Sequence, residues 1–212
     1  MSLRERQRAT RRNTILTVAE ELFRERGFDS VTTRAIAEAA EIGEATLFRY
    51  FGTKSEIFFA AIGARVIATI DGLLEQDAEY VAAHPDLTAD DYVERALSTY
   101  RARARAFTED PTNILTFALL GLDPDPALHT VPIGQGDRVV TLVRGLIENG
   151  QQRGKLNPDV SARDIAANLN GTYIHEMARG TSRNLPPAGF EERLVDRLRV
   201  QLAVLLYRST PD

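Results

Sequence analysis

The sequence predicts an all-α protein with a small N-terminal three-helix domain followed by a larger helical domain. Apolar residues recur every three or four positions over most of the 212 residues, as they do on the buried faces of amphipathic helices. Clusters of proline, glycine and aspartate separate these segments, and no alternating pattern long enough for a strand occurs. Apolar residues make up 43% of the chain, which is sufficient for a packed core.

The first predicted helix has one apolar face and a glycine at its end. Its apolar residues are Ile15, Val18, Ala19, Leu22 and Phe23. Gly27 is placed to end this helix, because glycine adopts the left-handed backbone that a C-cap often requires.

An arginine-rich segment precedes this helix. It contains Arg4, Arg6, Arg8, Arg11 and Arg12 against one acidic residue, Glu5. We expect a mobile arm that tracks phosphates when it is bound to nucleic acid. A disordered solubilising tail is the alternative interpretation.

Residues 32–54 form the most informative stretch of the chain. They predict two short helices joined by a tight turn, with Thr32 as the N-cap of the first and Lys54 at the start of a further helix. Apolar residues that would face a small core are Ile36, Ala37, Ala40, Ile42, Leu47 and Phe51. The opposite faces carry polar residues that can reach phosphates or base edges. This division suits a helix-turn-helix, in which one helix braces the DNA backbone and the next enters the major groove.

Residues from about 14 to 62 resemble the DNA-binding domain of the TetR family of bacterial transcriptional regulators. The resemblance rests on Phe23, Gly27 and the segments TTRAIAEAA and ATLFRYFGTKSEIF. It implies that Thr32 and Lys54 hold phosphates and that Arg34 reaches the backbone or a base. The full set of DNA-binding residues predicted in this way is Thr32, Thr33, Arg34, Glu44, Ala45, Thr46, Phe48, Arg49, Tyr50 and Lys54.

Four positions depart from the common family pattern. Glu41 replaces the usual turn glycine, and Gly43 stands where a capping serine is frequent. Phe48 replaces a common tyrosine, so a hydroxyl contact to phosphate is lost. Glu44 can accept a hydrogen bond from a cytosine amino group, or it can point to solvent.

Charge is distributed unevenly along the chain. The net charge is −4, but residues 1–54 carry +2 and the remainder carries −6. The chain has no cysteine, so disulfides and thiolate metal sites are excluded. No apolar run approaches the ~20 residues of a membrane span, and no signal-peptide pattern begins the chain. We therefore expect a soluble cytoplasmic protein that does not bind membranes.

The rest of the chain predicts a helical ligand-binding and dimerisation domain. Residues 1–54 would form the arm and the helix-turn-helix domain, and residues 55–212 would form the second domain. The expected helices cover residues 54–82, 88–108, 111–121, 136–153, 161–180 and 188–208, and residues 123–135 are expected to be a loop.

The last helix has two apolar stripes where a monomer's surface helix needs only one. One stripe contains Leu194, Leu198 and Leu202. The second stripe contains Val200, Val204 and Tyr207, and it indicates a partner. Pairing with the helix at 161–180 would give a four-helix interface between two copies, as the family resemblance also implies. The predicted homodimer contacts are Ile165, Leu169, Tyr173, Val200, Val204 and Tyr207. A helix buried within one chain is the alternative. Two recognition helices held about 34–36 Å apart would read a palindromic operator in double-stranded DNA.

A pocket for a small organic ligand is expected in the second domain, residues 55–212. Its candidate lining residues are Phe59, Tyr100, Phe107, Asn113, Phe117, Asn168, Tyr173 and His175. Arg101, Arg103 and Arg105 fan around different helix faces, which favours a solvated, ion-paired helix over one anion clamp.

Enzymatic and metal-dependent functions find no support. His175 and Glu176 resemble the start of a zinc-protease motif, but Arg179 occupies the place of the second histidine. We therefore predict no catalytic residues, no metal and no cofactor. The predicted function is a DNA-binding transcriptional regulator, a homodimeric repressor released from its operator by a small ligand. The alternative is a helical small-molecule-binding or scaffolding protein whose N-terminal helix-turn-helix domain has lost its affinity for DNA.

Overall fold

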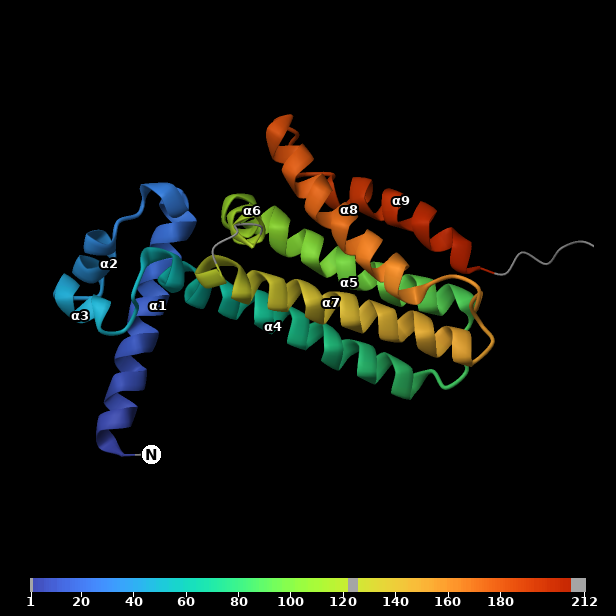
Figure 1. Cartoon of the computed structure of the whole chain (residues 1–212), viewed down its shortest axis with the longest axis horizontal. Coiled ribbons are helices and arrows are strands. Elements are labelled where there is room, and N and C mark those ends of the chain that lie inside the picture. Colours follow the sequence, from blue (N-terminus) through green and yellow to red (C-terminus); the bar gives the residue numbers. More distant parts are fainter. Residues whose placement is uncertain (1, 122–125, 207–212) are drawn as a thin grey trace, which may run out of the picture. The chain divides into compact units, whose positions relative to one another are not determined.

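The computed structural model describes residues 2–121 and 126–206, with side chains described everywhere in these ranges except at 126–133. All regular elements in the described part are helices, which confirms the predicted fold class (Figure 1). They are α1 (Leu3–Ser30), α2 (Thr33–Ala39), α3 (Glu44–Phe48), α4 (Lys54–Ala83), α5 (Ala89–Glu109), α6 (Pro111–Leu120), α7 (Pro126–Gln152), α8 (Ala162–Ser182), α9 (Phe190–Leu202) and the 3₁₀ helix η1 (Ala203–Leu205).

The chain divides into two compact units. Unit 1 comprises Met1–Ile67 and Thr112–Ile133, and unit 2 comprises Ala68–Pro111 and Gly134–Asp212. Helix α4 begins in unit 1 and ends in unit 2. The functional division predicted at residue 54 stays a prediction.

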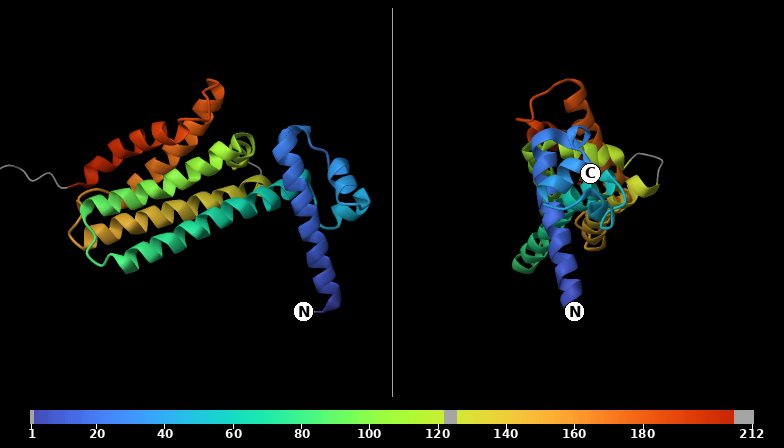
Figure 2. Two further views of the ribbon diagram at one scale, coloured as in Figure 1. Left: turned by 180° about the vertical axis from the view of Figure 1, so that it is seen from behind. Right: turned by 90° about the vertical axis from the view of Figure 1, so that its left-hand side faces the viewer.

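Helix α1 starts earlier than the sequence pattern indicated. The Ser2 hydroxyl accepts a hydrogen bond from the Glu5 amide, and the Glu5 carboxylate accepts one from the Ser2 amide at 2.6 Å. This capping box satisfies amides at the helix start. The arginine-rich segment predicted as a mobile arm is therefore helical, and it extends past α2 and α3 (Figures 1 and 2). Gly27 interrupts the helix at φ 73°, as its place in the sequence predicted.

The core of unit 1 joins the helix-turn-helix to α1 and α4. The Phe23 and Phe58 rings meet edge to face with centroids 5.1 Å apart. Ile36 and Leu47 of the helix-turn-helix are also fully buried in this unit. Helix α6 belongs to this unit as well, because the Asn113 side chain donates a 2.9 Å hydrogen bond to the carbonyl of Phe23.

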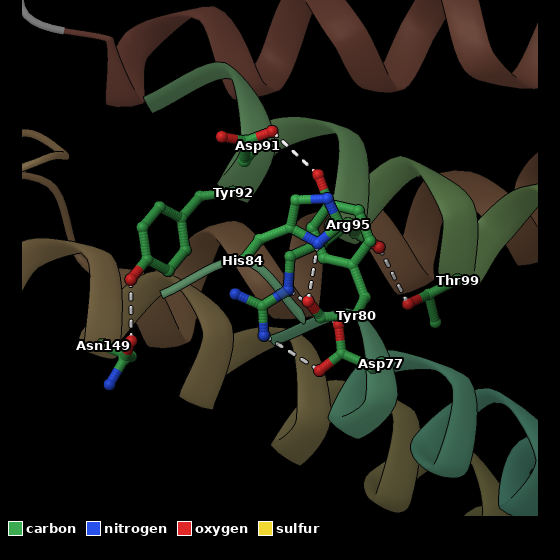
Figure 3. A network of polar contacts seen from close by, with 8 residues as sticks. All are labelled: Asp77, Tyr80, His84, Asp91, Tyr92, Arg95, Thr99 and Asn149. Atoms are coloured by element: carbon green, nitrogen blue, oxygen red, sulfur yellow. Dashed lines mark hydrogen bonds and ion pairs between the residues drawn. The ribbon is translucent and has the colours of Figure 1, made fainter. Parts of the chain in front are cut away.

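The core of unit 2 is formed by α5, α7, α8 and α9 with the C-terminal part of α4. Helix α9 packs against both α5 and α8. A polar network holds the end of α4 to its neighbours (Figure 3). Arg95 donates two hydrogen bonds to Asp77, at 2.7 and 2.9 Å, and Tyr92 donates to Asn149 on α7 at 2.8 Å. The far end of α4 is thus fixed within unit 2.

Two predicted element boundaries were wrong. Residues 126–135 were expected in a loop, but α7 begins at Pro126; residues 123–125 lie outside the described part. Proline is well tolerated in the first helical turn, where its missing N–H would have no partner. The last helix was expected to continue to residue 208, but α9 ends at Leu202 and a 3₁₀ turn follows.

One described helix is long and apolar enough to cross a membrane by composition alone. This is α4, whose most apolar 18 residues have a mean hydropathy of 1.8. Buried residues make up 44% of that window, and core helices of globular proteins often have the same composition.

Candidate nucleic-acid interface

Helices α2 and α3 form the predicted helix-turn-helix. The Thr32 hydroxyl accepts a 3.1 Å hydrogen bond from the Ala35 amide, which confirms Thr32 as the N-cap of α2. The turn is closed by the Ile42 amide, which donates to the carbonyl of Ala37 at 3.0 Å. Glu41 has φ 53° within this turn, in the left-handed region where the family usually has glycine.

The predicted base-reading residues lie on the outward side of α3. Ala45 and Arg49 are exposed, and Phe48 is 48% exposed although it is a large apolar residue. Thr46 and Tyr50 are half-buried at the edge of the same surface. Leu47 is fully buried and anchors the helix from the opposite side. This exposure agrees with the outward face expected for α3, and the contacts of these residues with DNA stay a prediction.

Two acidic residues are paired across the helix-turn-helix surface. The Thr33 hydroxyl donates a 2.6 Å hydrogen bond to Glu44, which links the first turns of α2 and α3. Arg34 donates to Glu38 at 2.9 Å, and this hydrogen bond raises the pKa of the Arg34 guanidinium. Glu44 therefore does not simply point to solvent, which was one of the two possibilities left open by the sequence.

Lys54 is held inward at the start of α4. Its ammonium donates a 2.8 Å hydrogen bond to the carbonyl of Phe28 and lies 4.2 Å from the centre of the Phe28 ring. These contacts tie the end of the α1 segment to α4. Two ammonium N–H groups remain beyond the carbonyl contact, and the phosphate contact of Lys54 stays a prediction.

A basic groove adjoins α3. It has a volume of about 990 Å³ and runs between the first turns of α1, the turn after α2 and the end of α3. Its charged lining residues are Arg4, Arg6, Arg8, Arg11, Glu41 and Arg49. Across the described ranges, none of these five arginines forms an ion pair, and Glu41 is the one acidic residue that lines the groove with them.

Two cation–π contacts connect α1 to the helix-turn-helix. The Arg8 guanidinium lies 6.0 Å from the Tyr50 ring centre, and that of Arg12 lies 5.0 Å from the Phe51 ring centre. The arginines before the first predicted helix were expected to form a mobile arm. Residues 4, 8 and 11 are spaced so that they share one face of a helix. This spacing could have predicted that the segment is helical and turns these arginines to one side.

Comparison with known proteins agrees with this geometry. Residues 15–61 match the family model described as bacterial regulatory proteins, tetR family. This segment belongs to the TetR family. It comprises most of α1, the helix-turn-helix and the beginning of α4. The prediction made from the motifs in residues 14–62 is thereby confirmed.

Curated relatives resemble the same part of the chain. The transcriptional regulator TcmR of Streptomyces glaucescens is 37% identical over 62 residues, which is 29% of this chain. MftR of Mycobacterium tuberculosis is 40% identical over 70 residues, which is 33% of this chain. The two matches span only 27% and 35% of the lengths of these relatives. Both relatives are named as regulators rather than enzymes, as the sequence predicted for this chain.

Solved structures extend the likeness to the fold of the whole chain. FadR of Thermus thermophilus, a TetR-family repressor in complex with lauroyl-CoA, has a TM-score of 0.70 at 24% identity. The match covers 95% of this chain and 98% of that protein. FadR of Bacillus subtilis, in complex with stearoyl-CoA, has a TM-score of 0.69 at 15% identity and covers 91% and 98%. The larger helical part that follows the TetR-family domain therefore has a fold known from these proteins.

The predicted ligand-binding residues do not gather at one place. Phe59, Asn113 and Phe117 belong to unit 1, where the rings of Phe59 and Phe117 lie 5.8 Å apart. Tyr100, Phe107 and Tyr173 belong to unit 2 and join Phe190 in one aromatic cluster. Asn168 and His175 face outward from α8, because they lie on the helix side opposite the buried Leu169 and Tyr173.

Some of the predicted dimer contacts are buried within their own chain, and others are exposed. Leu169 and Tyr173 are 0% and 3% exposed, so they pack inside their own chain and do not form a surface. Val200 and Val204 are 75% and 50% exposed, as expected for the second stripe. Ile165 is half-buried beside them, and Tyr207 lies outside the described residues.

A groove of about 820 Å³ runs along this outward face of α8 and α9. Ile165, Val200 and Val204 supply apolar lining, and Asn168, His175 and Arg197 supply polar lining. Inside the groove, Gln201 donates a 2.7 Å hydrogen bond to the Thr172 hydroxyl. Arg197 lies 3.2 Å from the buried carboxylate of Glu176, which also accepts a hydrogen bond from Arg179. Within the described part, no cluster of three histidine or acidic side chains suits a metal ion.

Proposed function

We propose that this protein is a DNA-binding transcriptional regulator that acts as a homodimeric repressor and is released from a palindromic operator by a small organic ligand. The observation that carries the proposal is the basic groove beside the exposed face of α3. Five arginines without acidic partners line it, although the chain as a whole carries a net charge of −4. Such local excess of cations is typical of surfaces that bind a phosphate backbone.

The roles of the individual residues follow from their placement. Ala45, Phe48 and Arg49 are exposed on α3 and at its C-cap, Thr46 lies half-buried at the edge of the same surface, and these side chains would meet base edges in the major groove. Thr32 and Lys54 at two helix starts, with the arginines of α1, would hold phosphates on either side. Thr33 and Arg34 sit in the first turn of α2, next to this surface.

The homodimer is supported by the exposed valines of α9 and η1. Apolar side chains at 50% and 75% exposure lose contact with water when a second copy covers them. The groove on α8 and α9 would receive the same face of a partner in a two-fold interface. One helix-turn-helix reads few base pairs, and a dimer doubles the sequence that is read.

Ligand control is supported by the continuity of α4. This helix starts at Lys54 beside the helix-turn-helix, and its other end is fixed by Arg95 and Asp77 within unit 2 (Figure 3). A ligand that binds unit 2 better in one position of α4 than in another would shift the balance between DNA-binding and released forms. Proteins of this kind that regulate transcription work in the cytoplasm, which is where we propose that this one acts.

Titration of the purified protein with labelled DNA from upstream of its own gene tests the proposal. Fluorescence anisotropy should show binding that weakens with salt by about 0.9 log units per neutralised phosphate for each tenfold rise in concentration. Replacing Arg8 and Arg11 together with alanine should reduce this slope by about two. Arg163→Ala, which removes an exposed charge from unit 2, serves as the control and should leave the slope unchanged. Absence of binding, or binding insensitive to salt, would favour the alternative of a small-molecule-binding or scaffolding protein.

A further inference from the structure

Helix α5 carries four arginines, and three of them have acidic partners. Arg95 pairs with Asp77 at 2.7 Å, Arg101 with Glu94 at 2.9 Å, and Arg105 with Glu191 at 3.3 Å. These pairs agree with the ion-paired helix that the sequence predicted. Arg103 differs, because no carboxylate in the described ranges pairs with it.

Arg103 is turned toward the aromatic cluster of unit 2. Its guanidinium carbon lies 3.9 Å from the centre of the Tyr173 ring and 5.4 Å from that of Tyr100. One N–H donates a 2.9 Å hydrogen bond to the side-chain carbonyl of Asn170 on α8. A guanidinium has five N–H donors. The remaining donors are held in a fixed orientation by the two rings and by Asn170.

A buried hydroxyl without a partner lies in the same cluster. Tyr100 is 0% exposed, and its hydroxyl makes no hydrogen bond within the described part of the chain. Leaving such a group unpaired is unfavourable, so this hydroxyl calls for a hydrogen-bond partner from outside the described chain. Burial raises the pKa of this phenol to about 12, so it keeps its proton and remains a hydrogen-bond donor at neutral pH. The hydroxyl of Tyr173 is already used, because it donates to the backbone carbonyl of Arg103 at 3.3 Å.

We infer that Arg103 and the Tyr100 hydroxyl together form the recognition site for a carboxylate group on an otherwise apolar small molecule. A carboxylate supplies two acceptor oxygens that match the fork of a guanidinium, and the phenol supplies a further donor. The rings of Phe107, Tyr173 and Phe190 form the adjoining aromatic cluster and would contact the apolar part of such a molecule. This inference names the chemical class of the ligand in the proposed function and rests on that proposal.

The same geometry disfavours a cationic ligand. Aromatic rings bind quaternary ammonium groups through their faces. In this cluster the guanidinium of Arg103 already lies over Tyr173, so the cation site on that ring is occupied by the protein itself. A second positive charge would be repelled by Arg103, which has no acid to neutralise it.

The test compares molecules that share a body and differ in the head group. Decanoate, 1-decanol and decyltrimethylammonium are titrated against the full chain by isothermal calorimetry without DNA, and benzoate and 1-naphthoate extend the set to aromatic carboxylates. At least one carboxylate should bind, and it should bind more tightly than the alcohol. Arg103→Met should weaken that binding by about tenfold or more, and Tyr100→Phe by a smaller factor.

Two control variants distinguish the loss of a ligand contact from a general change in charge or folding. Arg105→Met removes a charge two positions away, where the arginine pairs with Glu191 at the surface, and it should leave the affinity unchanged. Tyr100→Phe removes only an unpartnered hydroxyl, so its circular dichroism should match that of the unchanged protein and its melting temperature should equal or exceed that of the unchanged protein, even if Arg103→Met misfolds. Preference for the ammonium compound, equal binding of acid and alcohol, no binding of any carboxylate, or undiminished binding in Tyr100→Phe would each overturn the inference. The titrations contain no DNA, so the measured affinity for the carboxylate does not depend on whether the protein binds DNA.

Discussion

The hydroxyl of Thr33 donates a 2.6 Å hydrogen bond to the carboxylate of Glu44 and thereby connects the first turns of α2 and α3. The contact fixes the position of an acidic side chain on the surface proposed to meet DNA. A carboxylate held there accepts hydrogen bonds and repels phosphates. Glu44 would therefore reduce binding to arbitrary sequences while permitting contact with a cytosine amino group.

Glu44→Gln should increase affinity for random DNA by about two- to fivefold, because it removes one negative charge and keeps an acceptor for Thr33. Anisotropy titrations on operator and random DNA at one salt concentration would measure this. Glu79→Gln, at an exposed position of α4 in unit 2, is the control and should have no effect. Equal affinity of Glu44→Gln and the unchanged protein for random DNA would contradict the proposed role.

Arg49→Ala should weaken binding to the operator by ~1–3 kcal/mol if the arginine reads a base. Arg49 is exposed at the end of α3 and lines the basic groove without an ion-pair partner among the described residues. The measurement compares the loss on operator DNA with the loss on random DNA. An equal loss on both would assign Arg49 to a phosphate instead.

Val204→Asp should produce monomers in analytical ultracentrifugation. Val204 is half exposed on the apolar stripe of the α8 and α9 groove, and a buried unpaired carboxylate is strongly unfavourable at an interface. Val204→Thr, which keeps the shape and adds no charge, should remain largely dimeric. A sedimentation coefficient for Val204→Asp equal to that of the unchanged protein would remove this face as the interface.

Glu41→Gly should stabilise unit 1 by roughly 0.5–1 kcal/mol. The φ of 53° costs a non-glycine residue about 1–2 kcal/mol, and the greater freedom of glycine in the unfolded chain offsets part of that gain. Urea unfolding followed by circular dichroism measures the change. Ala35→Gly, inside α2, has helical backbone and should destabilise the same unit by a similar amount. A loss of stability in Glu41→Gly would show that its side chain makes a compensating contact.

Stability should fall at alkaline pH, partly because of Tyr100. Its pKa is about 12 in the folded protein, against about 10 in the unfolded chain. Below pH 10 the phenol is protonated in both states, and its contribution to stability is complete. Between pH 10 and 12 only the unfolded state releases the proton, so stability decreases as the pH rises. Tyr100→Phe should show a shallower decline in urea midpoint over this range, and an identical decline would place Tyr100 in a more solvated setting.

The sequence alone determined the TetR-family character of residues 15–61, the fold class and the outward face of α3. These properties depend on local patterns: the 3.6-residue period of Ile36, Leu47 and their neighbours, the cap at Thr32 and the break at Gly27. Each acts within a few residues along the chain, so it can be read without knowledge of long-range contacts.

Only the tertiary structure decided which residues of a helix meet their own chain and which remain free. Leu169 and Val200 both belong to apolar stripes, yet one is fully buried and the other is 75% exposed, because α9 packs against α5 and α8 with the face that does not carry Val200. Arg103 and Arg105 are both arginines of α5, and only the fold turns one toward two tyrosines and the other toward Glu191. Such differences arise from contacts between residues tens of positions apart, which periodicity does not record.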